Sequence, residues 1–516
     1  MSASAPASHA PKLLAFAVPF LGILGAIQGS SPNVNSTALV SLAKDLNMSG
    51  GAVALAASAQ TIAIAATVIT TGLLADRLGR RKVLLAALLV GAAGSAISGL
   101  APVSAVYFLG QVIMGIGMGA VYGSAFGFIA AVAKPGKLPA ALGVFGASIG
   151  LTTVILTFAG GLAVGVNWRF GFFVMAAVSV LAFLAAPWIL PTVPHGKKGA
   201  FDAVGQLLLG FGIIGFLYGV SQLGESLTAP RTLIPLGVGA LLMAAFFVYE
   251  SKSKSAFYPV HLFREPIFIA AILAGFIYNF GTAVSFLQTT NLWQYVTGVA
   301  TQDIALWQLP LTAAGIVSAL IAGRMMTKGL TNRGALLIGS LIAVAGFVAL
   351  AIVSSQKSFF AFLPGIVLVG AGVVMVSIPF GNMIIKEAPA AEYGPVTSSR
   401  TTIGQFFYSI GFAAATVLVD RLTVGGVTKK LTDAGVQPDS IGTAVTSLNT
   451  YVRTGDDPST KLGKEALADA VTSYSGAFSV VMLVTAALIV VAALVATALL
   501  RKTDTSAPAA TSNGTS

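Results

Sequence analysis

A dense group of charged side chains separates two long apolar runs, and it holds the residues best suited to ion-pair chemistry. The group comprises Asp76, Arg77, Arg80, Arg81 and Lys82. So many charges cannot lie in hydrocarbon, so we expect a short polar turn between two membrane-spanning helices. A carboxylate in such a turn can dock on the positive N-terminus of another helix. We interpret Asp76 as a latch of this kind, whereas a charged loop that only sets topology is the favoured interpretation of Arg80, Arg81 and Lys82.

Neutral polar residues inside the apolar runs form a second group that could bind a ligand. Burying an amide costs on the order of 1–3 kcal/mol unless it finds a partner, so each of them could equally be satisfied by a neighbouring helix. Taken together they predict a cavity that is polar but largely uncharged. Arg400 is the one basic residue that could reach such a cavity, although we favour a side chain that snorkels to the cytoplasmic surface. The neutral candidates are Gln28, Asn33, Asn35, Gln60, Gln111, Tyr122, Asn279, Gln288, Asn291, Gln405 and Tyr408.

The composition identifies the class of protein in which these residues act. Of 516 residues, 56% are hydrophobic and only 9% are charged, against roughly 25% charged residues in a soluble domain. The chain is therefore expected to be an all-α integral membrane protein with many spans. It has no cysteine, which excludes disulfides, thiolate metal sites and cysteine nucleophiles.

Other functional classes are disfavoured by motifs that the sequence lacks. The net charge of +12 is not arranged as a basic stripe interleaved with aromatics, so we expect no nucleic-acid partner. No phosphate-binding loop is present, which argues against direct drive by ATP. No catalytic dyad and no His/Cys cluster appears among the apolar runs, so we expect neither an enzyme nor a bound metal or cofactor.

Apolar segments of roughly 20 residues, the length that crosses a bilayer, number about fourteen. Within the second half, the outer loop 421–472 is expected to be a solvated connector rather than a short amphipathic helix. The predicted units are a disordered tail at 1–12, a six-helix bundle at 13–195, a two-helix insertion at 196–265, a second six-helix bundle at 266–502 and a disordered tail at 503–516.

The distribution of Lys and Arg predicts the orientation. With an even number of spans, most of the 29 Lys and Arg residues fall on one side, which the positive-inside rule makes the cytoplasm. Both termini and the Asp76 turn are then cytoplasmic. The composition, rich in Ala and Gly, favours a bacterial cell membrane.

The glycines of the Asp76 turn reveal a family resemblance. Gly72 leaves room for a close neighbour and Gly79 permits the backbone reversal. The pattern G-x-x-x-D-R-x-G-R-R-K that begins at Gly72 resembles the signature loop between the second and third helices of the major facilitator superfamily. A weaker echo at Gly323 and Lys328 fits two homologous halves. The two additional helices at about 203–249 are similar to those of the superfamily's fourteen-helix branch of drug/proton antiporters.

This resemblance implies a function and a gate. A member of this branch would be a secondary active transporter, a monomer in the lipid bilayer that exports amphiphilic or hydrophobic small molecules by alternating access. The polar turn would be its cytoplasmic gate. The gate residues would be Gly72, Asp76, Arg77, Gly79, Arg80 and Arg81.

The chain departs from the family pattern where charged residues are usual. Gln111 stands where the family has a membrane-embedded arginine, and no Asp or Glu lies clearly inside a span. A proton-coupled carrier needs a group whose protonation differs between its two states. The candidates are then Asp76, Asp303 and Asp420, near the membrane faces, and we expect transport to depend weakly on pH. The alternatives are a uniporter, a carrier not coupled to protons, and a non-transporting sensor or scaffold.

Overall fold

The computed structural model consists of long α-helices, with no strand in the residues that it describes. A chain this apolar must satisfy its backbone hydrogen bonds internally, and a helix does so within one segment. The expected tail 1–12 lies outside the described residues. Of the expected tail 503–516, only 503–506 are described, as the end of a helix. The described residues are 14–48, 50–192, 202–223, 226–253, 256–299, 301–389, 392–454 and 459–506.

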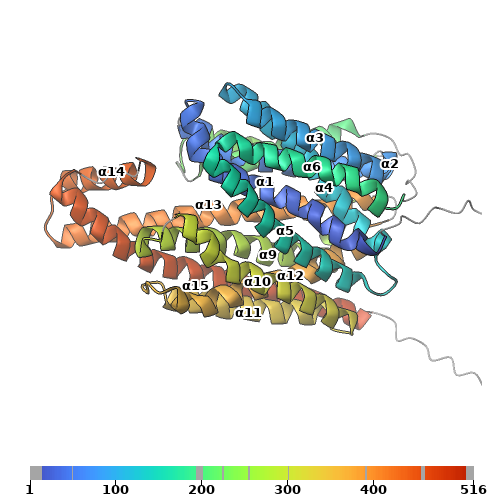
Figure 1. Cartoon of the computed structure of the whole chain (residues 1–516). Coiled ribbons are helices and arrows are strands. Elements are labelled where there is room, and N and C mark those ends of the chain that lie inside the picture. The colour runs from blue at the N-terminus through green and yellow to red at the C-terminus, as the bar shows by residue number, and fades with distance from the viewer. Residues whose placement is uncertain are drawn as a thin grey trace, which may run out of the picture.

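The first six long helices form one bundle (Figure 1). They are α1 (Ala17–Asp45), α2 (Gly50–Leu78), α3 (Arg80–Leu100), α4 (Ser104–Val132), α5 (Leu138–Val166) and α6 (Trp168–Ile189). Helix α1 packs against α4, α5 and α6, and α3 packs against α4 and α6. A Cβ on Gly110 would lie 2.6 Å from the backbone nitrogen of Ser98. Helices α3 and α4 therefore meet nearly backbone to backbone, as small residues allow in membrane bundles.

Six later helices form a second bundle beside the first, drawn in yellow to red in Figure 1. They are α9 (Pro266–Leu292), α10 (Thr301–Thr327), α11 (Asn332–Ile352), α12 (Phe359–Glu387), α13 (Tyr393–Asp433) and α15 (Lys461–Ser506). Helix α9 packs against α12, α13 and α15, and α11 packs against α12 and α15. The two bundles touch chiefly where α5 meets α10 and where α2 meets α13. The fold is thus two six-helix bundles with two helical seams between them.

Two helices between the bundles make up the insertion. They are α7 (Ala203–Gln222) and α8 (Pro230–Lys252), which pack against each other. Helix α7 also contacts α2 of the first bundle and α13 of the second. The insertion therefore covers the seam between α2 and α13. The residue boundaries assigned to the bundles and the insertion from the sequence remain predictions.

Thirteen helices in the described residues are long and apolar enough to cross a membrane. Helix α1 is not among them, because its second half contains a polar run around Ser31, Asn33 and Asn35. Its 29 residues would still extend roughly 43 Å at 1.5 Å per residue, and it packs inside the first bundle. We therefore count α1 as the fourteenth spanning helix, in line with the expected number of about fourteen.

The segment 421–472 differs from the expected solvated connector. Most of its described residues are helical: α13 continues to Asp433, α14 covers Pro438–Thr454, and α15 begins at Lys461. Figure 1 shows α14 beyond the end of the second bundle. Sparse apolar residues hold these three helices together in a small core of their own, which a connector would not have. That core contains Val427, Leu431, Ile441, Ala444 and Ala466.

A buried pair of carboxyl groups anchors the insertion. Asp202 caps α7 by accepting from the backbone nitrogen of Gly205 at 2.9 Å, and Glu250 accepts from the backbone nitrogens of Phe257 and Tyr258, each at 2.6 Å. Their other oxygens are buried without a further donor. A Cβ on Gly205 would meet one oxygen from each acid, at 2.5 and 2.8 Å. The two acids therefore face each other across Gly205, where only a residue without a side chain fits.

The acid pair also positions the linker between the insertion and α9. Glu250 accepts hydrogen bonds from the backbone nitrogens of two successive residues, Phe257 and Tyr258. These bonds hold Tyr258 in the interior, where this residue is 3% exposed. Burial raises the pKa of the Tyr258 hydroxyl, which therefore stays neutral. The linker that leads from the insertion to α9 is thus held to α8 by hydrogen bonds to one acidic side chain.

Replacing Glu250 tests this anchor. We expect Glu250→Ala to lower the melting temperature of the purified protein in detergent, because two buried N–H groups lose their acceptor at about 1–3 kcal/mol each. Glu250→Gln keeps an oxygen that can accept from both backbone nitrogens, so its melting temperature should stay near that of the wild type. Glu465→Ala, which removes an exposed acid, is the control. Equal melting temperatures for Glu250→Ala and the control would contradict the anchor.

Candidate functional site

The polar turn between α2 and α3 lies where α13 begins, and we call this end of the protein the Asp76 end. Helix α2 ends at Leu78 and α3 begins at Arg80. Gly79 between them has a φ of 97°, a left-handed conformation that a side chain would disfavour. The glycine expected to permit the reversal therefore does so. It brings Asp76 and Arg80 onto adjoining turns of two different helices.

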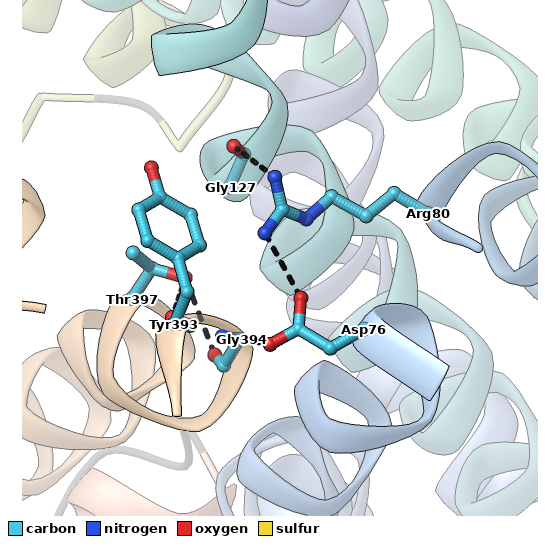
Figure 2. A network of polar contacts seen from close by, with 6 residues as sticks. All are labelled: Asp76, Arg80, Gly127, Tyr393, Gly394 and Thr397. Carbon is cyan, nitrogen blue, oxygen red and sulfur yellow. Dashed lines mark hydrogen bonds and ion pairs between the residues drawn. The ribbon is translucent and has the colours of Figure 1, made fainter. Parts of the chain in front are cut away.

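Asp76 connects the two bundles. Its Oδ2 accepts a hydrogen bond from the backbone nitrogen of Gly394, and its Oδ1 forms an ion pair with Nη2 of Arg80 at 2.9 Å (Figure 2). Gly394 is the second residue of α13, so its N–H has no partner within that helix. The N-terminus of a helix is also its positive end. The carboxylate of one bundle is thus docked on the helix terminus of the other, with only 12% of its side chain exposed.

Arg80 contributes more than topology to this contact. Its Nη1 donates to the backbone oxygen of Gly127 on α4 at 3.2 Å, and its guanidinium carbon lies 4.5 Å from the ring centroid of Tyr393 (Figure 2). The charged-loop interpretation of Arg80 is therefore replaced by a structural role beside Asp76. Arg81 instead donates to the backbone oxygen of Pro187 at 2.8 Å, inside the first bundle. Arg77 lies in the last turn of α2.

Glycines let the two bundles approach closely at this end. A Cβ on Gly72 would lie 2.6 Å from the backbone oxygen of Gly394. On the other seam, a Cβ on Gly143 of α5 would lie 2.5 Å from the oxygen of Ala319, and one on Gly323 of α10 would lie 2.6 Å from the oxygen of Pro139. Both seams are thus closed by backbone contacts that no larger residue could make.

Three of the polar candidates in the first bundle join neighbouring helices. Gln111 donates to Ser98 at 2.9 Å, and Gln60 donates to Ser31 at 2.5 Å. Asn35 donates to the backbone oxygen of Ala56 at 2.8 Å and accepts from the Tyr107 hydroxyl. All three side chains are buried. They hold the bundle together, in line with the alternative that each buried amide is satisfied by a neighbouring helix.

The remaining neutral candidates divide between buried and partly exposed residues. Gln28 is buried in α1, and buried Gln288 accepts from the Tyr474 hydroxyl at 3.2 Å. Asn279 donates to its own helix at the oxygen of Gly275, at 2.8 Å. Partial exposure inside a bundle is what the wall of a cavity would show. The partly exposed candidates are Asn33, Asn279, Asn291, Gln405 and Tyr408.

The favoured interpretation, in which the Arg400 side chain reaches toward the cytoplasmic surface, is wrong. Its Nη1 donates to the hydroxyl of Tyr122 on α4, across the seam between the bundles. Its guanidinium carbon lies 4.7 Å from the ring centroid of Phe126 and 5.1 Å from that of Phe380. The aromatic rings and the tyrosine hydroxyl together hold the charge inward of Asp76. Arg400 and Tyr122 are thus the two cavity candidates that the structure joins across the bundles.

The three proton-coupling candidates do not form a cluster in the described residues. Asp76 is engaged at the Asp76 end, and Asp420 is exposed toward the far end of α13. Asp303 is in α10, but its side chain lies outside the described residues. The sequence analysis missed the acid pair of Asp202 and Glu250. The signal was present, since each acid stands at the end of an apolar segment of the insertion.

Comparison with known proteins identifies relatives along most of the chain. The sequence is 27% identical over 419 residues to the tetracenomycin C resistance and export protein of Streptomyces glaucescens, which covers 79% of this chain and 76% of that protein. It is 25% identical over 423 residues to the puromycin resistance protein of Streptomyces alboniger, covering 81% of this chain and 82% of that protein. A multidrug resistance protein B homolog of Mycobacterium tuberculosis is 26% identical over 395 residues, covering 75% and 72%.

The fold has solved counterparts. It is similar to the proton:xylose symporter XylE bound to 6-bromo-6-deoxy-D-glucose, with a TM-score of 0.60 at 14% identity over 93% of this chain and 94% of that one. At this identity the likeness concerns the fold alone. The sequence model of the Major Facilitator Superfamily matches residues 21–413. With two six-helix bundles and a family match over most of its length, the chain belongs to the Major Facilitator Superfamily and is a multi-pass membrane transporter.

Proposed function

We propose that this protein exports amphiphilic or hydrophobic small molecules across a bacterial cell membrane by alternating access. The observation that carries the proposal is the hydrogen bond from Gly394 to Asp76, which joins the two bundles where α13 begins and α2 ends. An exporter of this type opens its cavity to one side at a time. A contact that closes one end and can be broken is the element that such a cycle needs.

The strength of the Asp76 contact suits a reversible latch. A carboxylate at a helix N-terminus contributes about 0.3–2 kcal/mol, depending on burial. The latch is therefore strong enough to bias the closed state and weak enough to open during a transport cycle. Arg80 supports it by fixing the carboxylate from the other side. Gly72 supports it by letting α13 come close enough for the hydrogen bond.

The orientation follows from the distribution of charge. Placing the Asp76 end in the cytoplasm puts most Lys and Arg residues on the inner side, in agreement with the positive-inside rule. Both termini are then cytoplasmic as well. The arrangement described here is accordingly closed toward the cytoplasm.

Similarity to resistance proteins supports the direction of transport and the substrate class. The relatives include an export protein for tetracenomycin C and a puromycin resistance protein. Partly exposed polar residues lie beside aromatic ones in the second bundle, where the rings of Phe276 and Phe407 are 5.3 Å apart. A surface of this mixed character suits molecules with both apolar and polar parts.

Removing the charge of Asp76 tests the latch. Asp76→Asn keeps an oxygen that can accept from Gly394 but loses the attraction to the helix N-terminus and to Arg80. We expect expression to be unchanged and transport in proteoliposomes to fall about tenfold, the effect of roughly 1.4 kcal/mol. Asp439→Asn, at an exposed position in α14, is the matched control and should transport normally.

The same variant can be followed structurally because the chain has no native cysteine. Spin labels on Lys137→Cys and Lys328→Cys would report the distance between the bundles at the Asp76 end. We expect Asp76→Asn to populate longer distances than the control does. Unchanged transport together with an unchanged distance distribution would show that Asp76 is not a latch.

Coupling to protons forms a separate prediction. Asp76 is engaged near the end of α2 and Asp420 is exposed, so we expect substrate flux to change less than about twofold between about pH 6 and about pH 8. Proteoliposomes with and without an imposed proton gradient provide the measurement. Flux that dissipates the gradient in step with substrate movement would instead identify a proton antiporter, and a carrier without coupling would then be excluded.

A further inference from the structure

Arg400 occupies a position between the bundles that a structural role alone does not explain. It lies six residues after Gly394 on α13, or roughly 9 Å further into the protein at 1.5 Å per residue. Its Nη1 binds the Tyr122 hydroxyl of the first bundle, while Phe380 of the second bundle faces the guanidinium. The charge therefore touches both halves of the carrier at once.

Among the residues that the structure describes, this charge has no counter-ion. The ion pairs of the described residues involve other cations, and none includes Arg400. Its Nε is buried without a hydrogen-bond partner. Ionisable groups inside a membrane bundle are costly and usually have a partner of opposite charge. Cation–π contacts such as those with Phe126 and Phe380 recover about 0.5–2 kcal/mol each, but they supply no negative charge. The missing partner is an anion.

The groups around Arg400 indicate which anion would fit. A guanidinium presents its N–H groups as a planar fork that matches a carboxylate. The Tyr122 hydroxyl accepts from Arg400, so its own proton remains free to donate. Two kinds of donor thus meet at one place, and the rings of Phe126 and Phe380 face the guanidinium. An acidic head on an apolar molecule would satisfy both the donors and the rings.

We propose that Arg400 and Tyr122 bind the carboxylate of the transported amphiphile, so that this carrier selects acidic substrates over neutral and cationic ones. The inference rests on the proposed export function and names its substrate class. Because the two residues belong to different bundles, a bound carboxylate bridges the seam inward of the latch. Binding then favours the arrangement in which the Asp76 end is closed.

Three pyrene probes that differ only in their polar group test the charge preference: 1-pyrenebutyrate, 1-pyrenebutanol and a pyrenebutyl trimethylammonium salt. Their affinities for the purified full-length protein are measured by fluorescence polarisation at neutral pH. We expect the wild type to bind pyrenebutyrate at least about tenfold more tightly than pyrenebutanol, the effect expected for a charge-assisted hydrogen bond. The trimethylammonium probe should bind more weakly than pyrenebutanol.

Variants assign this preference to the site. Arg400→Gln should bring the affinity ratio of pyrenebutyrate to pyrenebutanol to about one, and Arg400→Lys should retain part of it because the charge remains without the fork. Arg421→Gln, which removes an exposed arginine from the same helix, should keep the wild-type ratio. Reporting a ratio makes the result independent of any general loss of folded protein. A wild-type ratio near one, or the same ratio in Arg400→Gln and Arg421→Gln, would overturn the proposal.

Two further measurements distinguish a substrate site from a site for inorganic anions, and binding from transport. Sodium chloride that raises the melting temperature of the wild type but not of Arg400→Gln, without any preference for pyrenebutyrate, would assign the site to an inorganic anion and overturn the substrate assignment. Flux in proteoliposomes distinguishes binding from transport. Preferential binding of pyrenebutyrate without flux would keep the anion site and contradict the export function. Flux of pyrenebutanol without any preference for pyrenebutyrate would keep the export function and overturn the anion site.

Discussion

The charge-assisted contact between Asp76 and the first turn of α13 is the interaction on which the arrangement of the Asp76 end depends. A helix terminus leaves backbone N–H groups without partners, and here one of them receives a carboxylate from the other bundle. Arg80 restrains that carboxylate and also reaches α4 and Tyr393. The contact is local, but it joins two large bodies at one place. In the latch that we propose its modest free energy would be an advantage, because a carrier held shut by a stronger bond could not cycle.

Small residues make that contact possible, and in the proposed latch they would also let it open. At Gly72 and Gly394 on one seam, and at Gly143 and Gly323 on the other, backbones meet without side chains between them. Interlocked side chains would have to change rotamers before the bundles could part, whereas glycine surfaces can separate by a rigid rotation. The echo of the Asp76 turn around Gly323 is therefore more than a trace of duplication. It supplies the same close approach on the second seam.

The sequence predicts the fold well, and it singles out Asp76, whose contact with Gly394 the structure shows; the reasons are physical. Long apolar runs allow few alternatives to spanning helices, and an acid among bases at the end of a span needs a partner. The partner was harder to find, because Gly394 becomes a donor only where α13 begins. The roles of Asn35, Gln60 and Gln111 could not be predicted either, since apolar periodicity does not show which face of a wholly buried helix meets another helix. In 421–472 the apolar residues that hold α14 are too sparse to stand out in the sequence.

Helix α13 connects features that the sequence presents as separate. Its first turn receives Asp76, and the Tyr258 hydroxyl from the insertion linker lies beside its Ser399. The next residue, Arg400, reaches Tyr122 of the first bundle. Farther along, the ring of Phe406 stacks on Phe216 of α7 at 5.3 Å. The latch and the anion site that we propose, and the packing of the insertion, thus all involve this one helix. Because α7 packs on α2 and α13 and α8 packs on α7, the two additional helices would restrain the seam that opens in the transport cycle that we propose.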